Sequence, residues 1–204
     1  MELLSKHNLD LDQITSALHD RDVVEWEVVL KLDPWIRTIL QAACKLYYTR
    51  FFMRPIYRGY FGDRKEWHPT FVGSEENISV TTEVAQWLIK SVRLESNAHF
   101  HESYERRSFR SGAADRIFER ANLLISEEKS AGPPTSTNSL MVLRNKLEKA
   151  NQNYLDNLHL GNFKSRGSYY DSDAYGRGEA FGNTVNLGQR KKLKAITMSG
   201  LSTS

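Results

Sequence analysis

Residues 33–57, DPWIRTILQAACKLYYTRFFMRPIY, change from a helical to a β-type pattern near their middle. Asp33 and Pro34 form a strong helix start, because aspartate is a favoured cap and proline is tolerated in the first turn. Apolar residues then recur at helical spacing: Trp35, Ile36, Ile39, Leu40, Ala43 and Leu46. From Tyr47 the stretch becomes aromatic and β-like. The sequence therefore predicts a helix over 34–46 and a strand over 47–57.

Another strand is predicted over residues 23–31, which are rich in β-branched side chains. Its apolar residues alternate and share one side: Trp26, Val28 and Leu30. Glu25 and Glu27 fall on the other side, which we expect to face water.

Residues 68–73 predict a third strand, reached from the second through a turn rich in glycine and aspartate. The turn residues are Gly59, Gly62 and Asp63. The sequence thus predicts an α+β fold, in which a small antiparallel sheet is covered by helices. The covering helices are expected over 34–46, 77–98 and 104–128.

The predicted helix over 77–98 carries an apolar stripe that we expect to face the core. Its members are Val80, Val84, Trp87, Leu88, Ser91 and Val92. Gly73 and Asn77 are expected to close the preceding strand and to cap this helix.

Beyond an α+β body over 1–130, the chain changes character. Residues 131–139 have the composition of a linker, 140–160 predict an amphipathic helix, and 161–204 form a basic tail rich in Gly, Ser and Tyr. The amphipathic helix is predicted either to pack on the body or to pair with a second copy through 140–158.

Three small residues of the tail lie four apart: Ala174, Gly178 and Gly182. On a helix they form a smooth ridge that allows close approach of another helix or of a phosphate backbone. Because glycine weakens a free helix, we expect contacts to hold this one, with packing on the body as the favoured use.

The composition narrows the class of protein. The 204 residues are 40% hydrophobic and 11% aromatic, enough to build a core. No apolar run is long enough to span a membrane, and the N-terminus lacks the pattern of a signal peptide. Cys44 is the single cysteine and is predicted to be a small core side chain. We therefore expect a cytoplasmic protein without disulfides.

Charge is unevenly distributed along the chain. Residues 1–130 contain 18 Lys and Arg against 20 Asp and Glu, whereas 131–204 contain 10 against 5. A basic C-terminal part favours anionic partners, although surplus lysines can also serve solubility alone.

The 47–65 segment interleaves arginines with aromatic rings, a pattern typical of single-stranded nucleic-acid binding because phosphates take the charges and bases stack on the rings. The candidate binding residues, including a basic run in the tail, are Tyr48, Arg50, Phe52, Arg54, Arg58, Arg64, Lys65, Arg190, Lys191, Lys192 and Lys194. In the alternative interpretation the rings are core and the arginines line the outer face of a hairpin. Alternation places Phe52, Arg54 and Ile56 opposite Phe51, Met53 and Pro55.

Two further patterns are weaker. The predicted helix over 104–128 carries a basic cluster that favours a solvated face: Arg106, Arg107, Arg110, Arg116 and Arg120. His99 and His101 would point apart on a helix and lack a third ligand at a suitable spacing, although His68 and Glu102 are candidates. No phosphate loop or catalytic triad pattern occurs, so we expect neither a resident metal nor another cofactor.

Several segments read together resemble a family of unknown function that is common in tailed phages and prophages. The segments are residues 2–12, 35–48, 70–77, 108–117 and 173–187. The resemblance implies a phage or mobile-element origin and no established activity. Members of that family usually carry an additional helix before the first segment, so Met1 is expected to be an internal start.

Three hypotheses follow for the function. The first is a non-catalytic phage accessory protein that binds nucleic acid through the 47–65 hairpin and the tail. The second is an interaction module that inhibits a host defence or replication enzyme. The third is a metal-dependent enzyme that uses His68, His99 and His101.

Overall fold

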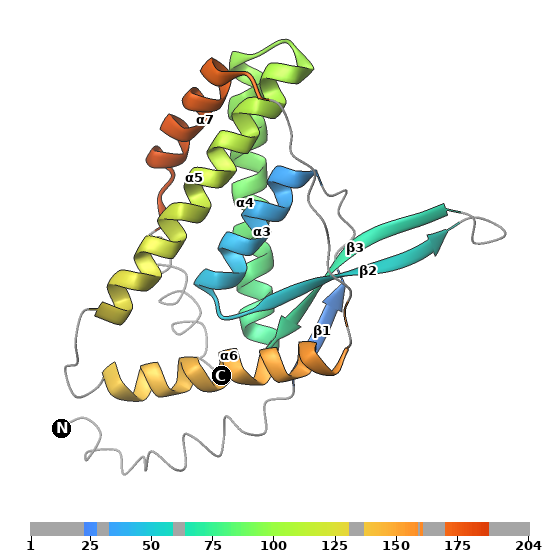
Figure 1. Cartoon of the computed structure of the whole chain (residues 1–204), viewed down its shortest axis with the longest axis vertical. Helices are drawn as coiled ribbons and strands as arrows, with labels where there is room; N and C mark the ends of the chain where they lie inside the picture. Colours follow the sequence, from blue (N-terminus) through green and yellow to red (C-terminus); the bar gives the residue numbers. More distant parts are fainter. Residues whose placement is uncertain are drawn as a thin grey trace, which may run out of the picture.

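The computed structural model describes residues 23–27, 33–58, 64–130, 137–158, 160 and 170–187 (Figure 1). A three-stranded sheet lies beside a group of packed helices, and the two longer strands project from the body as a hairpin. The predicted α+β class is therefore confirmed.

The sheet consists of β1 (Val24–Glu27), β2 (Arg50–Arg58) and β3 (Arg64–Gly73). The strand order is β1-β3-β2 with both pairs antiparallel, so β2 is an edge strand. β3 begins four residues before the predicted start, because it pairs with β2 along the whole hairpin from Arg58 opposite Arg64. Phe51 lies opposite Phe71, and the two rings contact each other on the face that packs against the helices.

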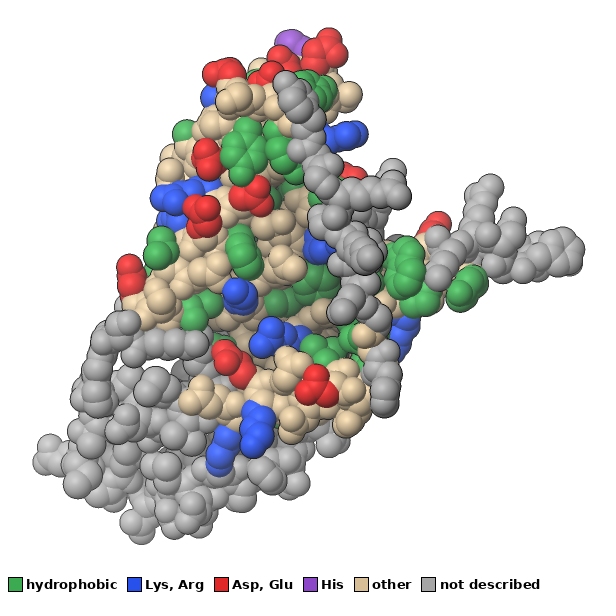
Figure 2. Space-filling model, viewed as in Figure 1, with side chains coloured by type: hydrophobic (Ala, Val, Ile, Leu, Met, Phe, Trp, Pro, Cys, Tyr) green, Lys and Arg blue, Asp and Glu red, His purple; other side chains and the backbone are tan. Residues whose placement is uncertain are grey.

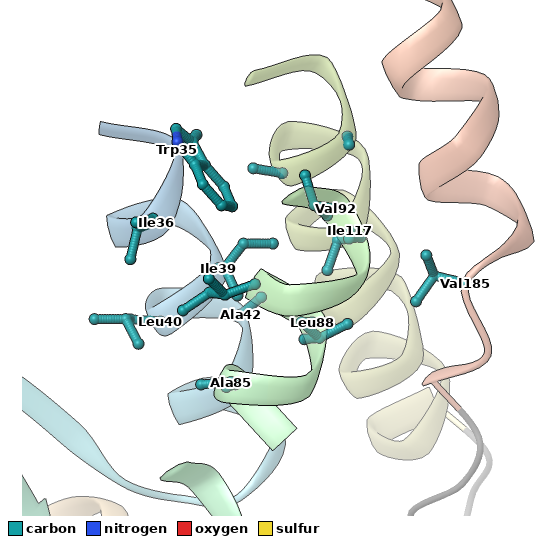
Figure 3. Close-up of a cluster of buried hydrophobic side chains, with 14 of the residues drawn as sticks. Trp35, Ile36, Ile39, Leu40, Ala42, Ala85, Leu88, Val92, Ile117 and Val185 are labelled. Atoms are coloured by element: carbon teal, nitrogen blue, oxygen red, sulfur yellow. The ribbon is translucent and has the colours of Figure 1, made fainter. Parts of the chain in front are cut away.

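Helix α3 (Pro34–Leu46) begins where Asp33 and Pro34 predict, and it lies at the centre of the molecule. It packs against β2 and against the long helices α4 (Glu75–His99) and α5 (Ser103–Ser130). Figure 3 shows the resulting core, in which Ile39 of α3, Leu88 of α4 and Ile117 of α5 point toward one another. The predicted core role of Cys44 is confirmed, since its side chain is buried.

Helix α4 differs from its prediction in two ways. Its N-cap is Ser74 rather than Asn77. Its buried residues are Ile78, Thr81, Ala85, Leu88, Ile89, Val92 and Ser96. The predicted stripe mixed two faces of this helix, because Trp87 is 41% exposed.

Helix α6 (Thr137–Asn157) packs on the sheet face that is turned away from the helical core (Figure 1). Asn151 is buried and donates to the carbonyl oxygen of Tyr48 at 2.8 Å. The Tyr154 hydroxyl donates to Glu25 Oε1 at 3.0 Å. The prediction that Glu25 faces water is therefore wrong: its side chain is 21% exposed beside α6. Of the predicted alternatives for this helix, packing on the body is observed, and self-pairing through 140–158 stays a prediction.

Helix α7 (Ser172–Thr184) packs along α5, so the small-residue ridge has its favoured use (Figure 1). A Cβ on Gly178 would lie 2.1 Å from the carbonyl oxygen of Phe109, and one on Gly112 of α5 would lie 2.2 Å from that of Tyr175. The two backbones approach this closely only because both positions lack a side chain. Asp171 caps α7 by accepting from the Ala174 amide at 2.8 Å.

Arginines of α5 hold the neighbouring helices in place. Arg120 donates to the carbonyl oxygens of Gly182 and Val185 at 2.6 and 2.7 Å, at the C-terminal end of α7. Arg116 reaches Asn183, and Arg110 reaches Ser96 and Asn97 of α4. These three arginines are partly buried and have partners on neighbouring helices, so the favoured solvated face holds for them only in part.

A partly buried polar pair lies between α5 and α7. The Tyr175 hydroxyl donates to Asp115 Oδ2 at 2.8 Å. Burial raises the pKa of the Tyr175 phenol, and the hydrogen bond to Asp115 raises it further. Burial also raises the pKa of Asp115, against the hydrogen bond that favours its ionised form. Both groups therefore depend on the α5–α7 contact.

Gly178→Ala is expected to lower the free energy of unfolding by about 1–3 kcal/mol, because the new methyl group collides with backbone atoms of α5. Gly176→Ala is the matched control on the same helix, where a Cβ meets nothing within 4 Å. This second change is expected to stabilise by up to about 1 kcal/mol through helix propensity. Urea unfolding followed by circular dichroism measures both, and equal effects would contradict the close packing.

Tyr175→Phe is expected to destabilise the protein by about 1 kcal/mol near neutral pH, because Asp115 loses its partly buried donor. A tyrosine whose pKa is raised on folding stabilises fully below its unfolded pKa of about 10 and loses that stabilisation as the pH rises further. The stability difference between wild type and variant should therefore shrink above about pH 10 in urea titrations. Tyr57→Phe, at an exposed ring, controls for the loss of one phenol, and a constant difference would contradict the linkage.

Candidate functional site

A groove of about 980 Å³ lies between α3, α5, α6 and the edge strand β2. Its lining combines cationic and aromatic side chains: Arg37, Lys45, Arg50, Tyr48, Phe52 and Trp67. Figure 2 shows Lys and Arg side chains on the viewed face between the helical body and α6, with apolar side chains on the projecting hairpin. The groove thus contains three of the predicted binding residues, Tyr48, Arg50 and Phe52, next to the helical core.

The wall formed by α3 comes from the polar face of that helix. Arg37, Gln41 and Lys45 are four residues apart and line the groove, while the apolar residues of α3 enter the core. Lys45 Nζ donates to Asn122 Oδ1 of α5 at 2.7 Å and lies 4.6 Å from the ring centroid of Phe118. Core burial therefore fixes which way these side chains point.

The turn after α3 holds a tyrosine in an unusual backbone conformation. Tyr48 has φ of +54°, in the left-handed region that is favoured by glycine. The Thr49 amide donates to the Cys44 carbonyl oxygen at 3.0 Å, which closes the helix as a Schellman motif. Together with the hydrogen bond from Asn151, this motif holds the tyrosine at the mouth of β2, where it lines the groove.

The face of β2 that carries Arg50, Phe52 and Arg54 is only partly open. Arg50 is exposed, whereas Phe52 is 9% exposed. Arg54 lies 5.3 Å from the Phe52 ring centroid and forms an ion pair with Glu25 at 2.5 Å. The register confirms the predicted alternation: Phe52 and Arg54 lie on one face of β2, and Phe51 and Met53 lie on the other. The Arg54 side chain is therefore held by contacts within the sheet, whereas the Arg50 side chain is exposed to solvent.

The outer half of the hairpin exposes two rings. Tyr57 is 61% exposed and Trp67 is 43% exposed, on the face opposite Arg54. The backbones of Arg58, Arg64 and Lys65 lie in β2 and β3, while their side chains are outside the described part of the structure. The basic run Arg190, Lys191, Lys192 and Lys194 also lies outside the described residues.

Positive charge predominates along the groove. The three cations Arg37, Lys45 and Arg50 are accompanied by one carboxylate, Glu148 of α6, among the described lining residues. Cys44 also borders the groove, but burial raises the pKa of its thiol to about 12. A thiol that stays protonated is a poor nucleophile, so this arrangement suits binding of an anion better than thiol chemistry.

The histidine hypothesis finds little geometric support. His68 is buried on β3 beside Glu66, at 3.3 Å, and His99 at the end of α4 lies 2.9 Å from Glu95. Within the described ranges, no three His, Cys, Asp or Glu side chains lie close enough together to hold one metal ion.

The sequence analysis missed two cations of the groove, Arg37 and Lys45, and the exposed ring of Trp67. The spacing of Arg37, Gln41 and Lys45 was the available signal for a polar stripe opposite the core face of α3. Trp67 carried no local signal, because its exposure follows from the projection of the hairpin beyond the helices.

Comparison with family models, with curated proteins and with solved structures finds no match for this chain. Among the described helices, none combines the length and the apolar character that crossing a membrane requires.

Native protein is expected to leave Cys44 unmodified by a disulfide reagent at about pH 8, and unfolded protein is expected to react with one equivalent. Burial blocks access of the reagent to the sulfur, and the raised pKa keeps the thiol protonated. Absorbance of the released thiolate measures the reaction, and rapid labelling of the folded protein would contradict the buried position.

Proposed function

We propose that the chain binds single-stranded nucleic acid in the groove between α3, α5, α6 and β2. The observation that carries the proposal is the convergence of Arg37, Lys45 and Arg50 with aromatic rings on one groove. Phosphates would lie at the cations, and bases would stack on the exposed rings. The mode is non-catalytic.

The exposed ring of Trp67 supports single strands over a duplex. Unpaired bases offer flat faces to aromatic side chains, whereas bases within a duplex are already stacked on one another. Trp67 is 43% exposed and also lines the groove, so a strand held by the cations lies within reach of its ring.

The arginines of α5 are less suited to this role. Arg110, Arg116 and Arg120 lie outside the groove lining and donate to acceptors on α4 and α7. Phosphate binding is therefore assigned to the groove, supplemented by the basic tail around Arg190 and Lys191 that the sequence predicts.

This role fits a phage accessory protein that works in the host cytoplasm, the setting that the sequence resemblance implies. Inhibition of a host enzyme and metal-dependent catalysis stay predictions, since neither has a supporting contact in the described residues.

The test measures binding of labelled single-stranded DNA, duplex DNA and RNA to the full chain at about 50 and about 200 mM salt. Binding is expected to prefer single strands and to weaken by at least about tenfold at the higher salt. Arg37→Gln with Arg50→Gln is expected to weaken binding by a further tenfold or so and to reduce the salt slope.

Two further variants make the test specific. Arg107→Gln with Arg177→Gln removes the same charge from exposed positions outside the groove and should leave binding nearly unchanged. Tyr48→Gly suits the left-handed backbone and should keep stability within about 1 kcal/mol, yet it removes a ring and should weaken binding. No binding at the lower salt, or equal losses for groove and control variants, would overturn the proposal.

A further inference from the structure

Helix α4 carries a second apolar face that points away from the body. Trp87 is 41% exposed and Leu94 is 61% exposed on this face. Val80 and Val84 are half-buried at its edge, and Val84 also packs against the core. The buried face of α4, centred on Ala85 and Leu88, accounts for its contacts with the core. α4 lies behind α3 and α5 in Figure 1, and it contributes no residue to the groove.

The spacing along this outer face is that of a helix–helix seam. Its positions alternate in steps of three and four: Val80, Val84, Trp87, Ser91, Leu94 and Ala98. This is the spacing by which one helix packs along another. From Val80 to Ala98 the seam extends roughly 27 Å, at 1.5 Å per residue.

Two charges beside the seam make it complementary to itself. Glu83 and Lys90 are both exposed, lie seven residues apart on one flank, and neither forms an ion pair within the described residues. An antiparallel copy of α4, with a two-fold axis near Gln86, places Glu83 of each copy opposite Lys90 of the other. The same alignment brings Val84 against Trp87 twice. In a parallel alignment this flank faces the opposite flank of the partner helix, so Glu83 and Lys90 do not meet each other.

We propose that this chain forms a two-fold symmetric homodimer through antiparallel pairing of α4 with α4 of a second copy. The occupant of the seam is a second copy because an antiparallel copy continues the apolar spacing and brings each Glu83 against a Lys90 of opposite charge. A two-fold axis requires such a self-complementary surface, in which each contact occurs twice. The interface leaves the groove on each subunit open.

The test is sedimentation equilibrium of the full chain between about 1 and 100 µM, and a monomer–dimer equilibrium is expected in this range. Glu83→Lys is expected to weaken the dimer by about tenfold, because two like-charged contacts replace two ion pairs. Lys90→Glu should do the same. The double swap Glu83→Lys with Lys90→Glu should restore the wild-type constant within about threefold, as in a charge-reversal cycle.

Two other variants complete the design. Trp87→Ala removes the central ring of the seam and should leave only monomer, while Lys149→Glu on α6 should change nothing. All of these positions are exposed, and circular dichroism confirms that each variant is folded. A monomer at the highest concentration, a dimer that ignores Glu83→Lys, or a double swap that fails to restore pairing would each overturn the proposal.

Discussion

The structure depends on the burial of α3 against three neighbours at once. Its buried residues include Ile36, Ile39 and Ala42, none of which exposes any surface, and they contact side chains from α4 and α5 (Figure 3). Small residues in the second half of the helix let the longer helices come close. Because most of the helix is enclosed, its polar residues share the one remaining direction. That direction is the groove, so the orientation of Arg37 and Lys45 is a consequence of the core.

The return of the C-terminal region to the body rests on a different principle. Gly112 of α5 and Gly178 of α7 have no side chains, so the backbones of the two helices contact each other directly. Such a contact offers little apolar area, and two hydrogen bonds add direction to it: Arg120 donates to the Gly182 carbonyl oxygen, and the Asp171 amide donates to Ser108 Oγ of α5. Val185 and Leu187 are buried just after the helix and anchor the segment to the core. The close approach and its polar anchors thus stabilise each other.

Local patterns were enough to predict α3 and the hairpin, because helix starts, apolar spacing and turn residues act over a few positions. They failed where two faces of one element compete. In α4 both faces are apolar at helical spacing, and only the position of α3 and α5 decides that Leu88 is buried while Trp87 is exposed. Glu25 was misjudged for the same reason, since α6, more than one hundred residues away, covers its side of the sheet. The groove itself joins four elements, so no window of sequence contains it.

The backbone at Tyr48 connects the fold to the groove. A left-handed residue at the end of a helix costs roughly 1 kcal/mol or more for any side chain, and glycine would close the Schellman motif without that cost. Tyr48 nevertheless occupies this position. The motif and the hydrogen bond from Asn151 keep the backbone in place, and the ring forms part of the groove wall beside Arg50 and Lys45. A strained residue that is held by its surroundings is characteristic of binding sites, where geometry is set before the ligand arrives. The strain and the cationic wall, which arise from different interactions, thus point to the same surface.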